Sequence, residues 1–145
     1  MSLGNITSAN AVIVMTVEDL FPAGVQLKQF ATDQALDGDD HEYAQARMGV
    51  DGQLAAGYVP NPWNVTVMLE ASSPSLKVMQ AIAQAMRTNR RTYEITFTVT
   101  IPSLKQVHTY RDGVLQSGKD APAIKKTLDP TSWRFVFGKY NQSGI

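Results

Sequence analysis

The sequence predicts a mainly β protein, a small β-barrel or sandwich flanked by one α-helix. Apolar and polar side chains alternate over several stretches, most regularly over residues 92–101, where Tyr93, Ile95 and Phe97 alternate with polar residues. Only residues 74–87 repeat their apolar side chains at helical spacing. A chain of 145 residues fits one domain, and we expect residues 1–145 to form a single one.

The expected strands differ in how many of their faces are apolar. Residues 11–17 are apolar on both faces, which predicts a central strand or one covered by another layer. Residues 63–70 alternate as residues 92–101 do, so each of these two strands has one buried face and one wet or shared face. Weaker alternation predicts further strands at residues 25–32, 43–50, 53–58, 104–111 and 133–137.

The connections divide into tight turns and long loops. Asp51-Gly52 and Asp112-Gly113 lie between extended runs and predict hairpin turns, because both residue types tolerate positive φ. Residues 33–42, which are rich in acidic side chains, and residues 114–131 show no period. We expect these two stretches to be irregular loops that either bind something or are disordered, as long loops in compact domains usually do.

The helix has a clear beginning. Ser73 supplies an N-cap and Pro74 a favourable first residue. The apolar residues that follow at helical spacing are expected to pack onto the sheet, and they are Leu76, Met79, Ile82, Ala83 and Met86. Arginines follow the end of the helix, where its dipole favours positive charge.

Charge is sorted along the chain. Residues 1–70 carry nine acidic and two basic side chains, a net charge of −7, whereas residues 71–145 carry four acidic and eleven basic ones, a net of +7. Oppositely charged halves suit head-to-tail stacking of identical copies. The alternative is that strands of the two halves interleave within one fold, in which case the sorting carries no information about assembly.

Catalytic and metal-binding motifs are missing from the sequence. It has no Gly-x-Ser-x-Gly elbow, phosphate loop or His-Glu-x-x-His, so we expect no enzyme and no cofactor. Residues 39–42, which include His41, lack the spacing of a calcium loop and are interpreted as a solvated acidic segment rather than a metal site. His108 is interpreted as a half-buried strand residue. Without cysteine there are no disulfides or thiolate ligands.

A membrane role is not expected, because no apolar run approaches the roughly 18 residues that span a bilayer. A second function stays open: a monomeric small β-barrel that binds a ligand or single-stranded nucleic acid through the basic segment 87–93, which ends in Tyr93. The formal net charge of zero argues against nucleic acid, since phosphate binding depends on accumulated positive charge. Trp63 and Trp133 lie on the apolar faces of their strands, which favours core positions over base stacking.

Four stretches, in this order, cover most of the chain: AVIVMTVEDLFPAGVQ, ARMGVDGQLAAG, VTVMLEASSPSLKVMQAI and KTLDPTSWRFVFGKY. They contain an apolar opening strand, a long hairpin, a strand that enters the helix through a Ser-Pro cap, and a closing aromatic strand. Their order and spacing resemble the tail tube proteins of contractile-tailed bacteriophages and, more distantly, the tube protein of type VI secretion systems.

This resemblance implies a tail-tube-like fold whose copies join through strands into hexameric rings, with the rings stacked into a channel through which DNA passes without specific binding. It implies a location in the virion tail after assembly in the host cytoplasm. Implied partners, besides the chain itself, are the tail sheath, the baseplate or tube initiator, and the tape measure protein.

Two sets of residues are expected to serve this assembly. Charged side chains of the acidic hairpin and of the basic segments are expected to form subunit and ring contacts: Asp33, Asp37, Asp39, Asp40, Glu42, Asp51, Arg87, Arg90, Arg91, Lys125 and Lys126. Side chains that alternate outward along the two strands of the long hairpin are expected to line the channel: Gln26, Lys28, Gln45 and Arg47.

Overall fold

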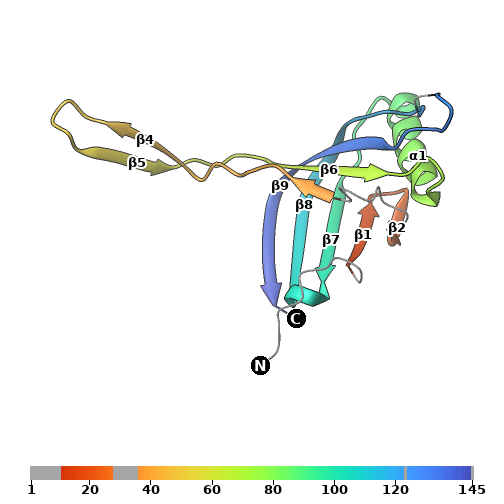
Figure 1. Cartoon of the computed structure of the whole chain (residues 1–145), viewed down its shortest axis with the longest axis horizontal. Helices are drawn as coiled ribbons and strands as arrows, with labels where there is room; N and C mark the ends of the chain where they lie inside the picture. Colours follow the sequence, from red (N-terminus) through yellow and green to blue (C-terminus); the bar gives the residue numbers. More distant parts are fainter. Residues whose placement is uncertain (1–10, 28–35, 123, 145) are drawn as a thin grey trace.

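The computed structural model describes residues 11–27, 36–122 and 124–144. Its body is an antiparallel sheet with one helix, and a long two-stranded hairpin extends from it (Figure 1). The elements are, in chain order, β1 (Val12–Val17), β2 (Phe21–Gln26), β3 (Leu36–Gly38), β4 (Ala44–Met48), β5 (Leu54–Tyr58), β6 (Trp63–Leu69), α1 (Pro74–Asn89), β7 (Ile95–Ile101), a 3₁₀ turn (Pro102–Leu104), β8 (Gln106–Gly118) and β9 (Thr131–Gly144).

The main sheet contains seven strands in the order β2-β1-β7-β8-β9-β6-β3. Each neighbouring pair is antiparallel, and β4 pairs only with β5 in a separate sheet. The expected mainly β fold with one flanking helix is therefore confirmed. The barrel is not closed within the described residues, because β2 and β3 form opposite edges of the sheet.

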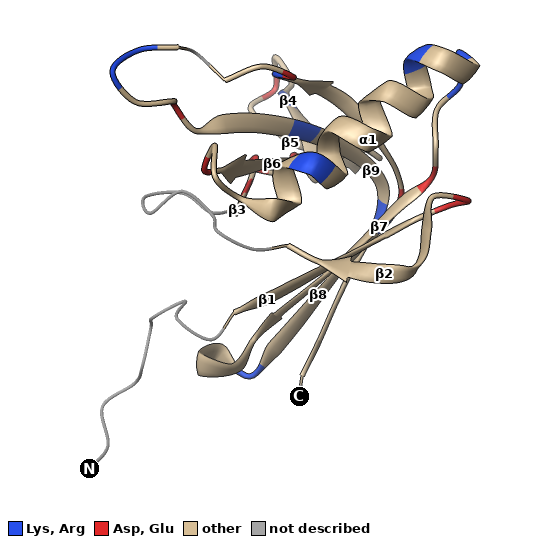
Figure 2. Ribbon diagram, turned by 90° about the vertical axis from the view of Figure 1, so that its right-hand side faces the viewer, with Lys and Arg blue, Asp and Glu red and all other residues tan. Residues whose placement is uncertain are grey.

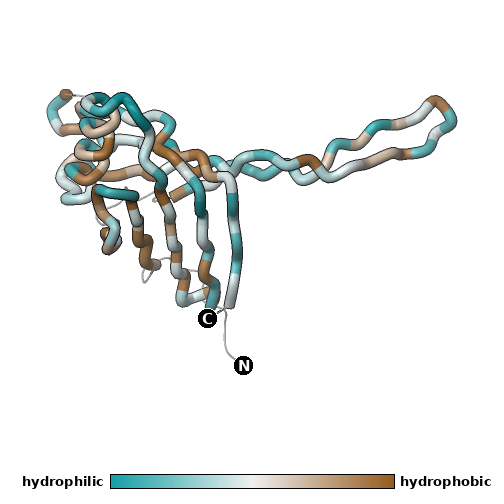
Figure 3. Tube along the Cα trace, turned by 180° about the vertical axis from the view of Figure 1, so that it is seen from behind, coloured by the Kyte–Doolittle hydropathy of each residue, from teal (hydrophilic) through white to brown (hydrophobic). Residues whose placement is uncertain are grey.

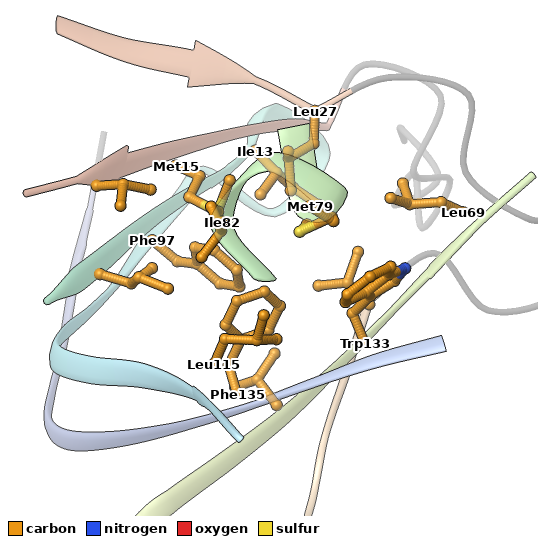
Figure 4. Packing of buried hydrophobic residues seen from close by; sticks show 14 of the residues in the cluster. Ile13, Met15, Leu27, Leu69, Met79, Ile82, Phe97, Leu115, Trp133 and Phe135 are labelled. Carbon is orange, nitrogen blue, oxygen red and sulfur yellow. The ribbon is translucent and has the colours of Figure 1, made fainter. Parts of the chain in front are cut away.

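The sheet bends over itself to enclose the core. Phe97 on β7 and Phe135 on β9 lie with ring centroids 4.7 Å apart, although β8 separates their strands in the sheet. Met79 and Ile82 of α1 fill the space between the two folded parts, close to Trp133 and Leu115 (Figure 4). Trp133 is thus a core aromatic, as expected, and its indole N–H donates to the Thr131 hydroxyl at 3.0 Å.

The helix begins as the sequence predicts. Ser73 accepts a hydrogen bond through its side chain from the amide of Ser75 at 3.1 Å, and Pro74 occupies the first turn. Leu76, Met79 and Ile82 are buried, which confirms the predicted packing face. No helix in the described ranges is long and apolar enough to cross a bilayer.

The predicted turn at Asp112-Gly113 is wrong. Both residues lie inside β8, where the pairing with β7 shifts register and Asp112 adopts a φ of 55°. An Asp-Gly dipeptide tolerates positive φ, which is needed both in a hairpin turn and in a β-bulge. The dipeptide alone therefore does not distinguish a turn from a bulge. Because β8 continues to Gly118, the predicted loop 114–131 is shorter than expected and its irregular part is residues 119–130.

The prediction for residues 33–42 also needs correction in the described part. Leu36–Gly38 forms β3, which pairs with β6, so Asp37 belongs to the body of the fold. The projecting hairpin consists instead of β4 and β5, and its turn is the predicted Asp51-Gly52. Asp37, Asp39, Asp40 and Glu42 precede this hairpin and lie at its base rather than at its tip. Asp33 and Lys28 lie outside the described residues.

Replacing Ile82, which is fully buried, by aspartate should unfold the protein. An unpaired carboxylate in this apolar core should lower the free energy of unfolding by roughly 3–5 kcal/mol. Thermal and urea melts followed by circular dichroism measure the change, with Ala81→Asp on the exposed side of α1 as the control. An Ile82→Asp variant that melts like the wild type but fails to associate would show that this face is an intersubunit surface.

Candidate assembly surface

The hairpin of β4 and β5, which we call the arm, has no other described part of the chain packed over it. Every residue from 42 to 58 is exposed (Figure 1). The cross-strand pairs Ala44–Tyr58, Ala46–Ala56 and Met48–Leu54 put six apolar residues on one face of the arm. The opposite face carries Gln45 and Arg47. Isolated two-stranded hairpins are marginal in water, so the apolar face of the arm is suited to burial against another surface.

The tip of the arm is a hydrogen-bonded turn. The amide of Gly52 donates to the carbonyl of Gly49 at 3.0 Å, and the amide of Gly49 donates to the carbonyl of Gln53 at 2.8 Å. Gly52 has a φ of 83°, a left-handed conformation that glycine adopts readily and that matches a type I turn followed by a bulge. This turn presents Val50 at the apex, with a relative exposure of 112%.

An aromatic cluster fixes the base of the arm to the body. His41 stacks on Trp63 with ring centroids 3.6 Å apart, and Trp63 packs on Tyr140 at 4.5 Å. The Tyr140 hydroxyl and Nδ1 of His108 are hydrogen-bonded, so both histidines of the chain belong to this cluster. His108 is half-buried in β8, as expected, whereas Trp63 is only half-buried and not a core residue. Within the described residues, no group of three histidine or acidic side chains is arranged to hold a metal ion.

Within the described residues, one long edge of the sheet lacks a partner strand. β6 pairs with β9 only from Thr131 to Phe137, so residues 138–144 of β9 pair with β8 alone. A groove of about 440 Å³ lies beside the beginning of this edge, lined by residues that include Tyr58, Trp63, Lys139 and Asn141. Unpaired backbone groups along an edge strand are a template for another strand.

The outer face of the sheet is polar and regular. Register places Gln26, Val14, Thr98, Thr109 and Asn141 in one row across five strands. Residues Thr96, Thr100, Arg111, Lys139 and Ser143 belong to the neighbouring rows of the same face. Along each strand these residues alternate with the residues of the core. Together they form a broad outer surface that no other described element covers.

Some of the residues expected to form contacts with other copies are already in ion pairs within the chain, and others are not. Arg87 pairs with Asp120 at 3.0 Å, Lys125 with Asp129 at 3.0 Å and Arg134 with Asp39 at 2.7 Å. Arg91 lies 3.6 Å from both Glu18 and Asp19, and 4.3 Å from the centre of the Tyr93 ring. Within the described part of the chain, no ion pair engages Asp40, Glu42, Asp51, Arg90 or Lys126.

The two charged halves interleave in the sheet. The basic half supplies the central strands β7, β8 and β9, and the acidic half supplies both flanks (Figure 2). Two ion-pair groups, Arg91 with Glu18 and Asp19, and Arg134 with Asp39, join the halves inside one chain. Some acidic residues of the first half are therefore neutralised by basic residues of the second half within one chain. This agrees with the alternative in which strands of the two halves interleave in one fold.

The residues expected to line a channel do not lie together in one chain. Gln26 belongs to the polar outer face, whereas Gln45 and Arg47 lie on the arm, which extends to the opposite side of the molecule (Figure 1). Sequence reasoning missed the unpaired edge of β9 and the row Thr98–Thr109–Asn141. The alternation of β7 was visible, but the register that aligns it with β8 and β9 depends on a bulge that the sequence did not reveal.

These features define a protein with an open sheet, one helix and a projecting arm. Across its full length it has the fold of a chain in the cryo-EM structure of the anti-feeding prophage baseplate, with TM-score 0.62, 12% identity and 99% of that chain covered. A chain of the sheath–tube complex of an extracellular contractile injection system matches 92% of it at TM-score 0.59 and 12% identity, with 88% of that chain covered.

A third chain, from the sheath/tube terminator structure of the same kind of system, covers 99% of this chain and 100% of its own, at TM-score 0.59 and 10% identity. At these identities the likeness shows a shared tail-tube-like fold. A comparison with curated protein sequences gives no match. The chain belongs to the family described as tail fiber protein gp32, whose model matches residues 4–141.

A cluster of carboxylates at one end of the polar face allows a pH test. The hydrogen bond and the charge of Asp112 raise the pKa of Glu94, and desolvation and Glu18 add to the effect. A raised folded pKa means that ionising Glu94 opposes folding, so its unfavourable contribution appears as pH rises through that pKa and is absent in acid.

Glu94→Gln should therefore raise Tm at pH 7.5, and the gain should vanish below about pH 4, where the carboxyl is protonated in both states. Melting curves at several pH values measure the difference. Glu42→Gln, at an exposed position with no ion pair in the described ranges, is the matched control. A gain that is the same at every pH would show that charge repulsion at Glu94 is not its source.

Proposed function

We propose that this chain is a structural subunit of a contractile phage tail or phage-derived particle, and that its copies form stacked hexameric rings. The observation that carries the proposal is the arm: seventeen consecutive exposed residues, 42–58, with an apolar face that nothing covers. Contact with another copy would bury this apolar face, whereas a monomeric binding module would leave it exposed to water. The shared fold with chains of injection-system assemblies supports the same function.

Rings would close through strand edges. The unpaired part of β9, residues 138–144, is long enough to pair with an edge strand of a neighbouring copy. We propose that its partner is β2 of the neighbouring copy, because β2 is the edge strand at the other side of the same sheet. Joining two different edges is a heterologous contact, and such contacts close into rings when the rotation between copies permits. The same pairing would remove an edge that favours aggregation.

The polar outer face would then form the wall of the channel. Its row of Gln26, Thr98, Thr109 and Asn141 offers hydrogen-bonding groups with few charges, and Arg111 and Lys139 lie at one end. Uncharged hydroxyl and amide groups would hold a passing polyanion loosely, because tight phosphate binding needs accumulated cations. Gln45 and Arg47 would contribute to the arm's contact with another copy.

A tail location implies further partners. Chains of the same fold occur in baseplate, sheath–tube and terminator structures, which supports contacts of this protein with a sheath and a baseplate. A tape measure protein and passing DNA would occupy the channel. We also propose that residues 1–145 act as one domain. The family's description as a tail fiber protein favours a second candidate, a fibre component, which predicts filaments without a central channel.

Removing the arm should abolish stacking and preserve the body. The variant that deletes residues 45–57 and joins Ala44 to its cross-strand partner Tyr58 through two glycines keeps every strand of the main sheet. We expect its Tm to match that of the wild type, while electron microscopy and light scattering show tubes for the wild type and rings or monomers for the variant. A wild-type protein that stays near 15.9 kDa at all concentrations would contradict the proposed function.

Salt and charge reversal should also affect stacking. Asp40 and Arg90 are the residues to reverse, because no ion pair within the described ranges engages either of them. If such charges meet between copies, Asp40→Lys should shorten tubes and a second change, Arg90→Glu, should restore part of their length. Each exposed pair contributes only about 0.2–1 kcal/mol and is screened by salt, but a ring repeats it. Tubes indifferent to salt and to both changes would exclude a contact between these charges.

A further inference from the structure

Val50 is not needed by the turn that presents it. Tight turns favour glycine, proline, asparagine, aspartate and serine, because these residues satisfy the backbone geometry or its hydrogen bonds. Here Gly49, Asp51 and Gly52 already make the turn, and a β-branched apolar side chain lies at its apex with a relative exposure of 112%. An apolar group held at the end of a hydrogen-bonded projection is suited to insertion into a cavity.

A small apolar pocket lies on the body. It is formed between the second half of α1, the end of β8 and the beginning of β9, and its volume is about 190 Å³. Its apolar walls are Ala83, Met86, Leu115 and Trp133. Gly118, which also lines the pocket, lets the Trp133 ring pack closely against β8, because a Cβ at this position would lie 2.0 Å from a carbon of that ring.

Charged groups surround the opening of the pocket. Arg87 and Asp120 line it and pair with one another at 3.0 Å, with about half of each side chain exposed. The side-chain amide of Gln80 donates to the carbonyl of Asp120 at 2.7 Å, which fixes the loop against α1. Lys119 lies between the lining residues Gly118 and Asp120, and no ion pair engages it in the described residues. Together with Arg87 and Asp120 it gives the rim and the residue next to it a net positive charge.

The tip and the pocket cannot meet within one chain. The arm points away from the body on one side, and α1 with the end of β8 and the beginning of β9 lies on the other (Figures 1 and 3). Any insertion of Val50 into this pocket therefore joins two copies. The arm tip and the pocket are different surfaces, so each copy can insert its tip into one neighbour and receive the tip of another. Such a heterologous contact can repeat from copy to copy.

We propose that the arm tip of one copy inserts Val50 into the Trp133 pocket of a second copy, between α1, the end of β8 and the beginning of β9. The apolar walls match the isopropyl group of Val50, and the net positive rim matches Asp51, which follows Val50 at the tip. One Asp51 oxygen accepts the amide of Gln53 at 3.1 Å, and its second oxygen remains to accept from Arg87 or Lys119. This proposal rests on the proposed self-assembly and names its receiving surface.

Another groove of similar size is the alternative site. It has a volume of about 210 Å³ and is lined by Leu36, Val99, Ile101, His108, Tyr110 and Tyr140. No lysine or arginine lines it, so the carboxylate of Asp51 would meet tyrosine and histidine side chains there but no permanent positive charge. Charge complementarity therefore favours the Trp133 pocket, and the test below separates the two.

Because the chain contains no cysteine, engineered disulfides give a direct test. A protein with Val50→Cys and Gln116→Cys, which lines the Trp133 pocket, should form a ladder of disulfide-linked oligomers under oxidation. Val50→Cys with Gln106→Cys, beside His108 in the other groove, should give no ladder. A ladder from the second protein and not from the first would overturn the proposal, as would the absence of any ladder in a protein that assembles.

Substitutions without cysteine provide an independent measure. Val50→Ser should raise the concentration needed for assembly by about tenfold, the effect of exposing one aliphatic side chain per contact. Ala83→Leu, which fills the pocket, should do the same, whereas Ala81→Leu on the exposed side of α1 should not. Wild-type assembly with unchanged thresholds for both test variants would reject this pocket and leave self-assembly standing. A wild type that never assembles would reject the proposed function itself.

Discussion

The fold depends on the bend of the long β8–β9 pair. One part of the pair, where Phe135 and Phe137 lie, covers the core together with β6, and the other part extends beyond it with β7. Gly113 permits this arrangement, because a Cβ there would lie 2.1 Å from the Phe137 ring. The Asp112 bulge redirects β8 at the same level. A straight pair of strands would leave Phe97 without its contacts to Phe135 and Phe137.

The bend also determines which surfaces remain unsatisfied. Because β6 follows β9 only as far as Phe137, the far end of β9 keeps a free edge, and the chain before β6 leaves the sheet as the arm. Trp63 lies at this corner and carries the stacked His41, so the arm departs from a packed base. A single set of packing contacts thus stabilises the monomer and positions the surfaces available to other copies. Polar rows on the outer face follow from the same register.

Local patterns in the sequence predicted most of the elements and little of their arrangement. The Ser73-Pro74 cap, the buried stripe Leu76, Met79 and Ile82, and the alternation around Phe97 each depend on neighbours within a few residues, and all were confirmed. Asp112-Gly113 was misinterpreted because a bulge and a hairpin need the same backbone freedom. The base position of Asp39 and its pair with Arg134 depend on a contact 95 residues apart, which no local pattern contains. The charge sorting was real, but strand order decides how much of it the monomer neutralises.

The exposed arm has a kinetic consequence. A two-stranded hairpin gains little stability on its own, so each copy gives up conformational entropy when its arm is ordered against a neighbour. In the proposed rings, a pair of free copies would gain one such contact for that loss, whereas a copy that joins an existing ring end would gain several at once. Growth from a template is then favoured over spontaneous initiation in solution. Under the proposed function, the chain would then assemble slowly from free copies and faster at a starting surface, so the timing of assembly would depend on whatever provides that surface.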